Sequence, residues 1–358
     1  MSKGTLGVMG CSLKGGLKAA LVAGGLLFSA LTFAQTSGSQ SSVATPADWL
    51  TRMVAAPSVT AYEGLFVYEN ASGISAVRIF HKPEDNIQKE RLIYQDGPYR
   101  EIVREGDKIA FIRPDGDISR FRTEGVSGLV ERLSNYQDDL RQSYRLLFGG
   151  NDRVAGRNAL RIEVQPRDSH RYGFALWLDR DTGLMLRSEL IGEKGAILER
   201  LQYVDLSTPQ ELPAQLLEPS RPVNWQPAPK KQPVPEASAL KALSWEMGWI
   251  PSGFELAGIS QADSPVSRQK VDSLLFSDGL SAFSVFVEKD QSKVLGPASE
   301  QIGATAAISR LFRQGDDYFN VTVIGEIPVG VAERVAVSVK PRNSSSQPSA
   351  DQNDKPSP

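Results

Sequence analysis

A dense run of prolines divides this chain of 358 residues into two parts. Eight prolines fall between Thr208 and Glu236, and each lacks the backbone N–H that a helix or a central strand requires. Proline at this density favours the extended polyproline II conformation, which forms a semi-rigid spacer. The sequence therefore predicts a larger domain over residues 46–207, a linker over residues 208–236 and a smaller domain over residues 237–340.

The composition is that of a folded protein with few options for chemistry. Hydrophobic residues make up 41% and charged residues 23% of the chain, and the formal net charge is only -2. This charge argues against a general binder of nucleic acid. The chain has one cysteine and two histidines, too few for a structural zinc site or a disulfide framework, so no metal and no cofactor is expected.

The first 34 residues have the pattern of an export signal. Three lysines and no acidic residue accompany an apolar run over residues 19–33, and this run of about 15 residues is short for a membrane span. Small side chains at Thr32 and Ala34 predict cleavage after Ala34, with an uncleaved anchor as the alternative. Cys11 would leave with the signal. The expected location is the periplasm of a Gram-negative cell, and residues 341–358, almost free of apolar side chains, are expected to form a disordered tail.

The larger domain alternates strand-like runs with turn residues. A short helix is expected after Thr45 and Pro46, followed by about ten strands. Residues 126–148 have helical spacing, which Gly149 and Gly150 are expected to end. A sheet of this length must curl or close to protect its edges. The predicted fold class is therefore α+β, a half-open antiparallel β-barrel with helices on its concave face, and this shape would offer an apolar cavity.

The smaller domain is expected to be a second α+β unit. Asp278-Gly279 separates residues 271–277 from residues 280–288 and is the strongest hairpin signal in the chain. Further strands are expected over residues 305–312 and 318–324. A closing helix is expected to begin near Pro328.

No catalytic pattern emerges from the sequence. His81 and His170 could each act as a general base, but neither accompanies a nucleophile motif or a pattern of carboxylates, and we interpret both as surface or loop histidines. The chain is therefore not expected to be an enzyme. An enzyme acting on envelope polymers remains an alternative, testable by replacing both histidines.

Aromatic residues recur along the predicted strands of the larger domain. They are core residues in the first instance. In a half-open sheet some of them would line a groove for an acyl chain. The candidates for this lipid cavity are Phe66, Tyr68, Phe80, Phe111, Phe121, Phe174 and Trp177.

Several runs in both halves resemble the MucB/RseB family of periplasmic regulators. In the first half they are residues 62–68 (YEGLFVY), 90–92 (ERL) and 96–104 (DGPYREIVR). In the second half they are residues 249–254 (WIPSGF), 275–288 (LFSDGLSAFSVFVE) and 321–328 (VTVIGEIP). The match extends over both domains in the same order, from about residue 46 to residue 340.

This resemblance implies a negative regulator of the envelope stress response. Members of the family bind the periplasmic segment of a transmembrane anti-sigma factor of the MucA/RseA type and shield it from regulated proteolysis, so that the sigma factor stays inactive. The larger domain of the family is similar to the lipoprotein carriers LolA and LolB. The resemblance also implies that lipid or lipopolysaccharide bound in that domain releases the partner.

Aromatic anchors commonly dominate protein interfaces, so the aromatic residues of the smaller domain are the candidates for partner binding. They are Trp245, Trp249, Phe254, Phe283, Phe286 and Phe312. Core packing is the alternative for each of them. A periplasmic lipid or lipoprotein carrier of the LolA type remains the alternative function, and it would not need residues 237–340. The oligomeric state stays open.

Overall fold

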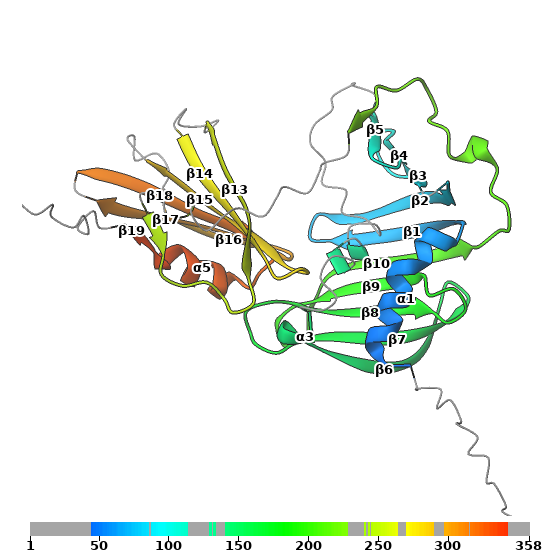
Figure 1. The fold of residues 1–358 in the computed structure, drawn as a ribbon, viewed down its shortest axis with the longest axis horizontal. Helices are drawn as coiled ribbons and strands as arrows, with labels where there is room; N and C mark the ends of the chain where they lie inside the picture. The colour runs from blue at the N-terminus through cyan, green and yellow to red at the C-terminus, as the bar shows by residue number, and fades with distance from the viewer. Residues whose placement is uncertain are drawn as a thin grey trace, which may run out of the picture. The chain divides into compact units, whose positions relative to one another are not determined.

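The computed structural model describes most of the chain between residues 44 and 342 (Figure 1). The described residues are 44–85, 87–113, 129–130, 132–133, 140–227, 240, 243, 245–263, 270–289, 297–314 and 316–342. The predicted export signal, the candidate Phe121, the end of the proline-rich segment and the predicted tail from residue 343 lie outside this range. In the part that is described, no helix is long and apolar enough to cross a membrane.

The first helix, α1 (Pro46–Val59), begins as the sequence predicts. Thr45 caps it, since the Asp48 N–H donates to the Thr45 hydroxyl and the Asp48 carboxylate accepts from the Thr45 N–H at 2.7 Å. Leu50, Met53 and Ala56 form its buried face. Figure 1 shows α1 lying across strands β7 to β10, so this face packs on the sheet.

An eleven-stranded sheet forms the core of the N-terminal half. Its order is β11-β5-β4-β3-β2-β1-β10-β9-β8-β7-β6, and its strand pairs are antiparallel. The strands are β1 (Tyr62–Asn70), β2 (Gly73–Glu84), β3 (Ile87–Tyr94), β4 (Glu101–Glu105), β5 (Lys108–Ile112), β6 (Tyr144–Val154), β7 (Arg157–Pro166), β8 (Gly173–Asp179), β9 (Met185–Ile191), β10 (Ile197–Ser207) and β11 (Gln226–Pro227). A short 3-10 helix, η1 (Glu193–Gly195), joins β9 to β10. Most neighbours in the sheet are neighbours in sequence, which confirms the predicted antiparallel pairing.

The predicted helix over residues 126–148 is wrong at its C-terminal end. Helix α3 covers only Leu140–Ser143, and β6 begins at Tyr144 and runs through Gly149 and Gly150 with a bulge. The apolar spacing of this segment suits either structure. Pairing with β7 satisfies the backbone along β6, although it leaves Leu147 and Phe148 exposed at the edge of the sheet.

The first part of the proline-rich segment packs against the sheet. Leu212 and Leu217 are buried against Phe80, and the short η2 (Ala214–Leu216) lies between them. The two residues of β11 then pair with β5. Residues 208–227 thus contact the N-terminal half at several points, which the proline count alone does not reveal.

A six-stranded antiparallel sheet of order β13-β14-β15-β18-β17-β16 forms the C-terminal half. Its strands are β13 (Glu255–Asp263), β14 (Lys270–Ser277), β15 (Ala282–Lys289), β16 (Ala298–Ile302), β17 (Thr305–Gln314) and β18 (Asp317–Gly325). Helix α5 (Val329–Ser338) covers one face, and β12 (Trp245–Met247) pairs with β19 (Val339–Pro341) beside it (Figure 1). The hairpin at Asp278-Gly279 is confirmed, whereas β16 has no predicted counterpart.

Candidate functional site

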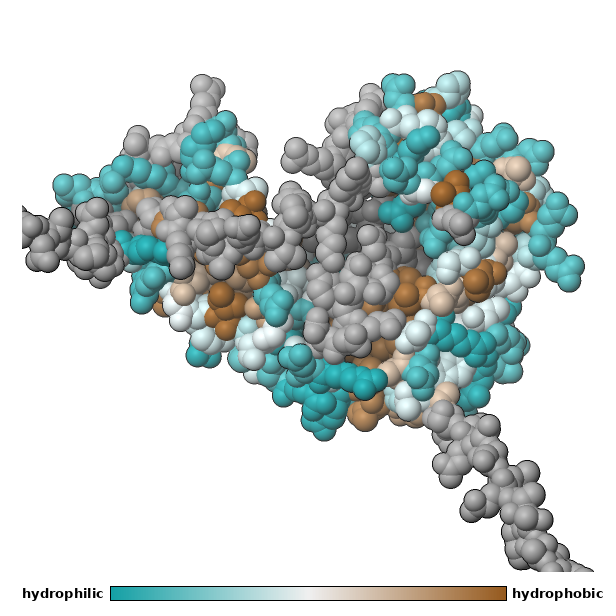
Figure 2. Space-filling model, in the orientation of Figure 1, coloured by the Kyte–Doolittle hydropathy of each residue, from teal (hydrophilic) through white to brown (hydrophobic). Residues whose placement is uncertain are grey.

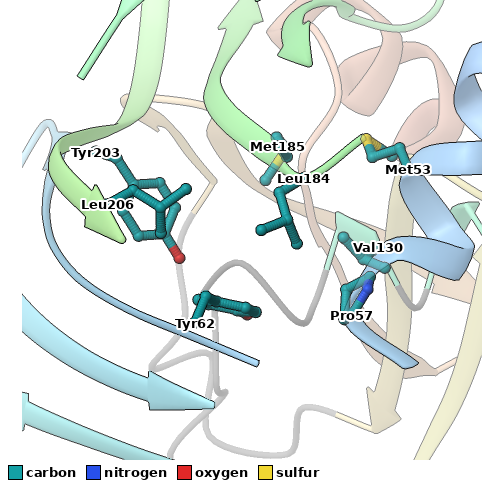
Figure 3. Close-up of a pocket in the computed structure, with 8 residues that line it drawn as sticks. All are labelled: Met53, Pro57, Tyr62, Val130, Leu184, Met185, Tyr203 and Leu206. Atoms are coloured by element: carbon teal, nitrogen blue, oxygen red, sulfur yellow. The ribbon is translucent and has the colours of Figure 1, made fainter. Parts of the chain in front are cut away.

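A small apolar pocket lies between α1 and the eleven-stranded sheet (Figure 3). It has room for about one water molecule, so an acyl chain can enter only if the surrounding elements separate. Aliphatic and aromatic side chains dominate its lining. The lining residues are Met53, Pro57, Tyr62, Val130, Leu184, Met185, Tyr203 and Leu206.

Pro57 sits in the last turn of α1, at the edge of this pocket. A proline has no N–H, so it cannot donate to the carbonyl of Met53 one turn earlier. The Pro57 carbonyl oxygen instead lies 2.8 Å from Nε2 of His81 on β2. The end of α1 is therefore held by a side chain from the sheet.

His81 is almost fully buried, at 1% exposure, so the interpretation of this residue as a surface histidine is wrong. Its ring stacks on Tyr62, with ring centroids 4.6 Å apart. Both residues face the same side because they are direct neighbours across β1 and β2. His81 thus packs under the helix, in contact with Pro57 and Tyr62, which line the pocket.

The two tyrosines of the pocket remain protonated. Burial, together with the nearby charge of Glu90, raises the pKa of Tyr62 and the pKa of Tyr203 well above 10. The eight lining residues include no charged side chain. The lining is therefore chemically suited to an apolar chain once the surrounding elements separate, with the phenol groups as its polar contribution.

None of the described lipid-cavity candidates lines this pocket. Phe66, Phe80, Phe174 and Trp177 are buried, Tyr68 and Phe111 are half-buried, and Phe121 lies outside the described residues. Phe80 packs with Leu212 and Leu217 in a cluster separate from the main core. Trp177 is flanked by the guanidinium groups of Arg161 and Arg187, at 5.1 and 4.2 Å from its ring centroid.

The pocket residues carry only a weak signal in the sequence. Tyr62 lies in a predicted strand, and Gly64 and Phe66, two and four residues further on, are buried as it is. The two-residue repeat of a strand could therefore have predicted that the Tyr62 side chain points into the core. Met53 lies on the apolar face of the predicted helix. The contribution of Leu184 and Met185 depends on how β9 passes under α1, which local pattern does not encode.

The partner-binding candidates of the C-terminal half fall into two groups. Trp245, Phe254 and Phe283 are buried core residues, at 2%, 7% and 1% exposure. Trp249 and Phe312 are half-buried and pack against the same core. Phe286 is half-buried and lies between the buried Val285 and Val287, so its side chain points to the opposite face of the sheet.

Phe286 has apolar neighbours on that outer face. Leu275 and Ile324 flank Ser284 across the strands and are 37% and 40% exposed. Ser284 and Phe286 share one face of β15, so the three apolar side chains belong to the same surface. We call Leu275, Phe286 and Ile324 the outer-face cluster. On the face of the molecule in Figure 2 the coloured surface is mostly hydrophilic, and its hydrophobic residues form small separate patches.

The remaining histidine lies beside an aromatic ring. His170 makes an edge contact with Trp249 at 5.3 Å between ring centroids, and its Nδ1 lies 3.7 Å from the Asp168 carboxylate. Within the described ranges, no group of three or more His, Cys, Asp and Glu side chains is placed to hold a metal ion.

Comparison with known proteins agrees across both halves. Residues 45–221 match the MucB/RseB N-terminal domain, and residues 239–340 match the MucB/RseB C-terminal domain. A curated relative, the sigma factor AlgU regulatory protein MucB of Pseudomonas aeruginosa, is 39% identical over 308 residues, which cover 82% of this chain and 90% of the relative.

Two solved structures of MucB superimpose on the chain to different degrees. The complex structure of Pseudomonas aeruginosa MucA/MucB gives a TM-score of 0.69 at 35% identity, covering 84% of this chain and 100% of the other. A crystal structure of MucB gives a TM-score of 0.53 at 32% identity, covering 83% and 98%. The chain is thus closer in structure to the MucB of the MucA/MucB complex.

Proposed function

This chain belongs to the MucB/RseB family, and we propose that it binds the periplasmic segment of a transmembrane anti-sigma factor of the MucA/RseA type and shields it from proteolysis. The observation that carries the proposal is the match of both domains, in order, to a relative named as a sigma factor regulatory protein and solved together with MucA. Shielding keeps the anti-sigma factor intact, and the envelope-stress sigma factor then remains inactive.

The proposed location is the periplasm, with the signal peptide cleaved after Ala34. Residues 46–207 would form the lipid-sensing domain and residues 237–340 the partner-binding domain. Residues 208–236 would connect them, and Leu212, Leu217 and strand β11 within this segment contact the first domain. Mass spectrometry of the protein purified from the periplasm tests the cleavage site, since a mature N-terminus at Gln35 is expected and retention of residues 1–34 would contradict it.

For the N-terminal domain we propose the half-open barrel of the LolA type, with α1 on its concave face. Two features support this form. The strands at the two ends of the sheet order, β11 and β6, are not paired with each other. The buried face of α1 shares one core cluster with residues of β1, β8, β9 and β10, so the helix occupies one side of the sheet.

The pocket beneath α1 is the proposed entry site for a lipid or lipopolysaccharide acyl chain. Its apolar lining fits such a chain, and its small volume implies that the lipid-free state is closed. Lipid entry would relieve the block on proteolysis only if the open state binds the anti-sigma segment less tightly than the closed state, because coupling between two sites requires differential affinity.

For the partner we propose the outer-face cluster around Phe286 as a contact surface of the C-terminal domain. Its side chains are partly exposed and lie on the face of the sheet opposite α5. Trp245, Phe254 and Phe283 are buried within the domain and stabilise it from inside.

A protection assay tests the proposed function. The purified protein, residues 35–358, is mixed with the periplasmic segment of the MucA-type anti-sigma factor of the same organism and treated with a nonspecific protease. We expect the segment to survive longer with the protein than with an equal amount of albumin. The Phe286→Ser variant should protect less, and Val337→Ser, at another exposed apolar position (71%), serves as the matched control. Equal digestion with protein and with albumin would contradict the proposal.

A further inference from the structure

The loop between β7 and β8 belongs to the N-terminal domain and contacts the C-terminal domain. It carries Asp168, Arg171 and Tyr172, and each of the last two forms hydrogen bonds with the C-terminal domain. Arg171 is 3% exposed although its side chain is charged. A buried charge of this kind requires a full set of partners, so its contacts define one arrangement of the surrounding groups.

The Arg171 guanidinium has partners from both domains. Nη1 donates to Oδ2 of Asp278 at 2.5 Å, and Nη2 donates to the carbonyl of Ser252. Within its own loop, Nε and Nη2 donate to the two Asp168 carboxylate oxygens at 3.1 Å each. The group also lies over the ring of Phe254, 4.9 Å from its centroid. All three guanidinium nitrogens of Arg171 thus donate hydrogen bonds.

Asp278 is equally well satisfied. Its Oδ2 accepts a second hydrogen bond from the Tyr144 hydroxyl at 3.0 Å, and its Oδ1 accepts from the backbone N–H groups of Leu280 and Ser281 at 2.9 and 2.8 Å. The side chains of Asp278 and Arg171 are both 0% exposed. Asp278 therefore stabilises its own hairpin turn through Oδ1 and binds the N-terminal domain through Oδ2.

Two further contacts between the domains accompany the Arg171–Asp278 pair, one apolar and one polar. Leu280, at the tip of the hairpin, is 1% exposed and belongs to the core cluster of the eleven-stranded sheet. Tyr172 donates from its hydroxyl to the carbonyl of Ile327 at 3.1 Å, just before α5. A different arrangement of the domains would leave Arg171 with Asp168 alone and Asp278 with the N–H groups of its own turn, so the pair would lose every contact that crosses between the domains.

We propose that Arg171 and Asp278 are positioning residues for partner binding, which hold the two domains in the arrangement that binds the anti-sigma segment. This inference rests on the proposed function. It is supported by the buried charge pair, which is fully bonded only in this arrangement, and by the closer superposition on MucB in the MucA/MucB structure than on MucB in the other crystal structure. Loss of either side chain would let the domains adopt other arrangements, and binding would then have to restore the first one.

The test compares affinity and domain arrangement in the same variants. Asp278→Asn keeps the shape and removes the charge, and Tyr144→Phe removes one hydroxyl as a milder change. The control is Asp263→Asn, which breaks the exposed ion pair of Asp263 with Lys270. Titration calorimetry with the anti-sigma segment gives the affinity, small-angle X-ray scattering of the free protein gives the domain arrangement, and thermal unfolding confirms folding.

We expect Asp278→Asn to weaken binding by about 10- to 100-fold and to broaden the distance distribution of the free protein, with a smaller change in the same direction for Tyr144→Phe. Asp263→Asn should bind within about 2-fold of the wild type. The double variant Arg171→Met/Asp278→Leu, which removes both charges, should bind more tightly than either of its single variants.

Wild-type affinity in folded Asp278→Asn and Tyr144→Phe would overturn this inference alone, as would weaker binding with an unchanged distance distribution. No binding by the wild type would reject the proposed function and this inference with it.

Discussion

The imidazole of His81 stacks on the phenol ring of Tyr62 at 4.6 Å, with 18° between the ring planes. The same imidazole reaches the Pro57 carbonyl at the end of α1. Tyr62 also lines the pocket, so one contact links the sheet, the helix and the proposed lipid site. Changes at His81 should therefore affect how firmly α1 is held.

Replacing His81 by alanine should lower the free energy of unfolding by about 1–3 kcal/mol, because the Pro57 carbonyl loses its buried partner. Urea unfolding followed by circular dichroism measures this. His170→Ala is the control, since His170 lies in a loop and is half-buried, and its cost should stay near about 0.5 kcal/mol. Equal stability of the two variants would contradict the described role of His81.

Two glycines of the C-terminal domain should respond in opposite directions to alanine. A Cβ atom at Gly325 would lie 2.5 Å from the Ala282 carbonyl oxygen, whereas a Cβ atom at Gly330 in α5 would meet no atom within 4 Å. Gly325→Ala should destabilise the domain by about 1–3 kcal/mol through overpacking. Gly330→Ala should stabilise it by up to about 1 kcal/mol, because glycine disfavours the helix. Thermal unfolding of both variants checks the pair, and a shift of the same sign in both would contradict this packing.

The turn after β8 should make stability depend on acid pH. Burial acts to raise the pKa of Asp179, but hydrogen bonds from Arg157 and Thr182 outweigh it and lower this pKa below 3.8. A lowered pKa means that the carboxylate stabilises the fold above about pH 4 and that this contribution is lost as pH falls through the folded value.

Asp179→Asn should therefore cost about 1.5–3 kcal/mol at neutral pH and less at lower pH. Chemical unfolding at pH 7 and at pH 3 measures the difference. Asp181→Asn, at an exposed position in the same turn, should leave both values within about 0.5 kcal/mol of the wild type. Equal losses of stability in both variants at both pH values would contradict this role of Asp179.

Filling the pocket should separate lipid binding from partner binding. Val130 is half-buried at the pocket, so Val130→Trp should occupy the space that an acyl chain would enter. We expect weaker binding of purified lipopolysaccharide and unchanged affinity for the anti-sigma segment, with less relief by lipid. Val59→Trp places the same ring at an exposed site on α1, 79% exposed, and should behave like the wild type. Unchanged lipopolysaccharide binding by Val130→Trp would exclude this pocket as the lipid site.

Local turn chemistry explains which parts of the fold could be predicted from the sequence. Asp278-Gly279 favours a tight reversal whatever surrounds it, and the hairpin appears where it was expected. Thr45 and Pro46 likewise mark the start of α1. In contrast, residues 144–148 suit a helix or a strand, and the free edge of β7 selects the strand.

The site depends on contacts between residues far apart in sequence, and this is why its details could not be predicted. Arg171 and Asp278 are 107 residues apart, and although Asp278 marks a hairpin turn in the sequence, no local pattern pairs it with Arg171. The pocket brings together residues from α1, β1, β9 and β10. Their aromatic character alone made Phe80 and Trp177 candidates for the cavity, but both pack elsewhere. Aromatic character does not distinguish the two cases, because large rings fill a core as readily as they line a cavity.

The most direct measurement is titration of the mature protein, residues 35–358, with the periplasmic segment of the MucA-type anti-sigma factor, with and without purified lipopolysaccharide. We predict a saturable 1:1 complex whose affinity falls when lipopolysaccharide is added, since lipid and partner favour different states of the protein. Absence of binding to the segment, with lipopolysaccharide still bound in a defined ratio, would contradict it and favour a lipid carrier.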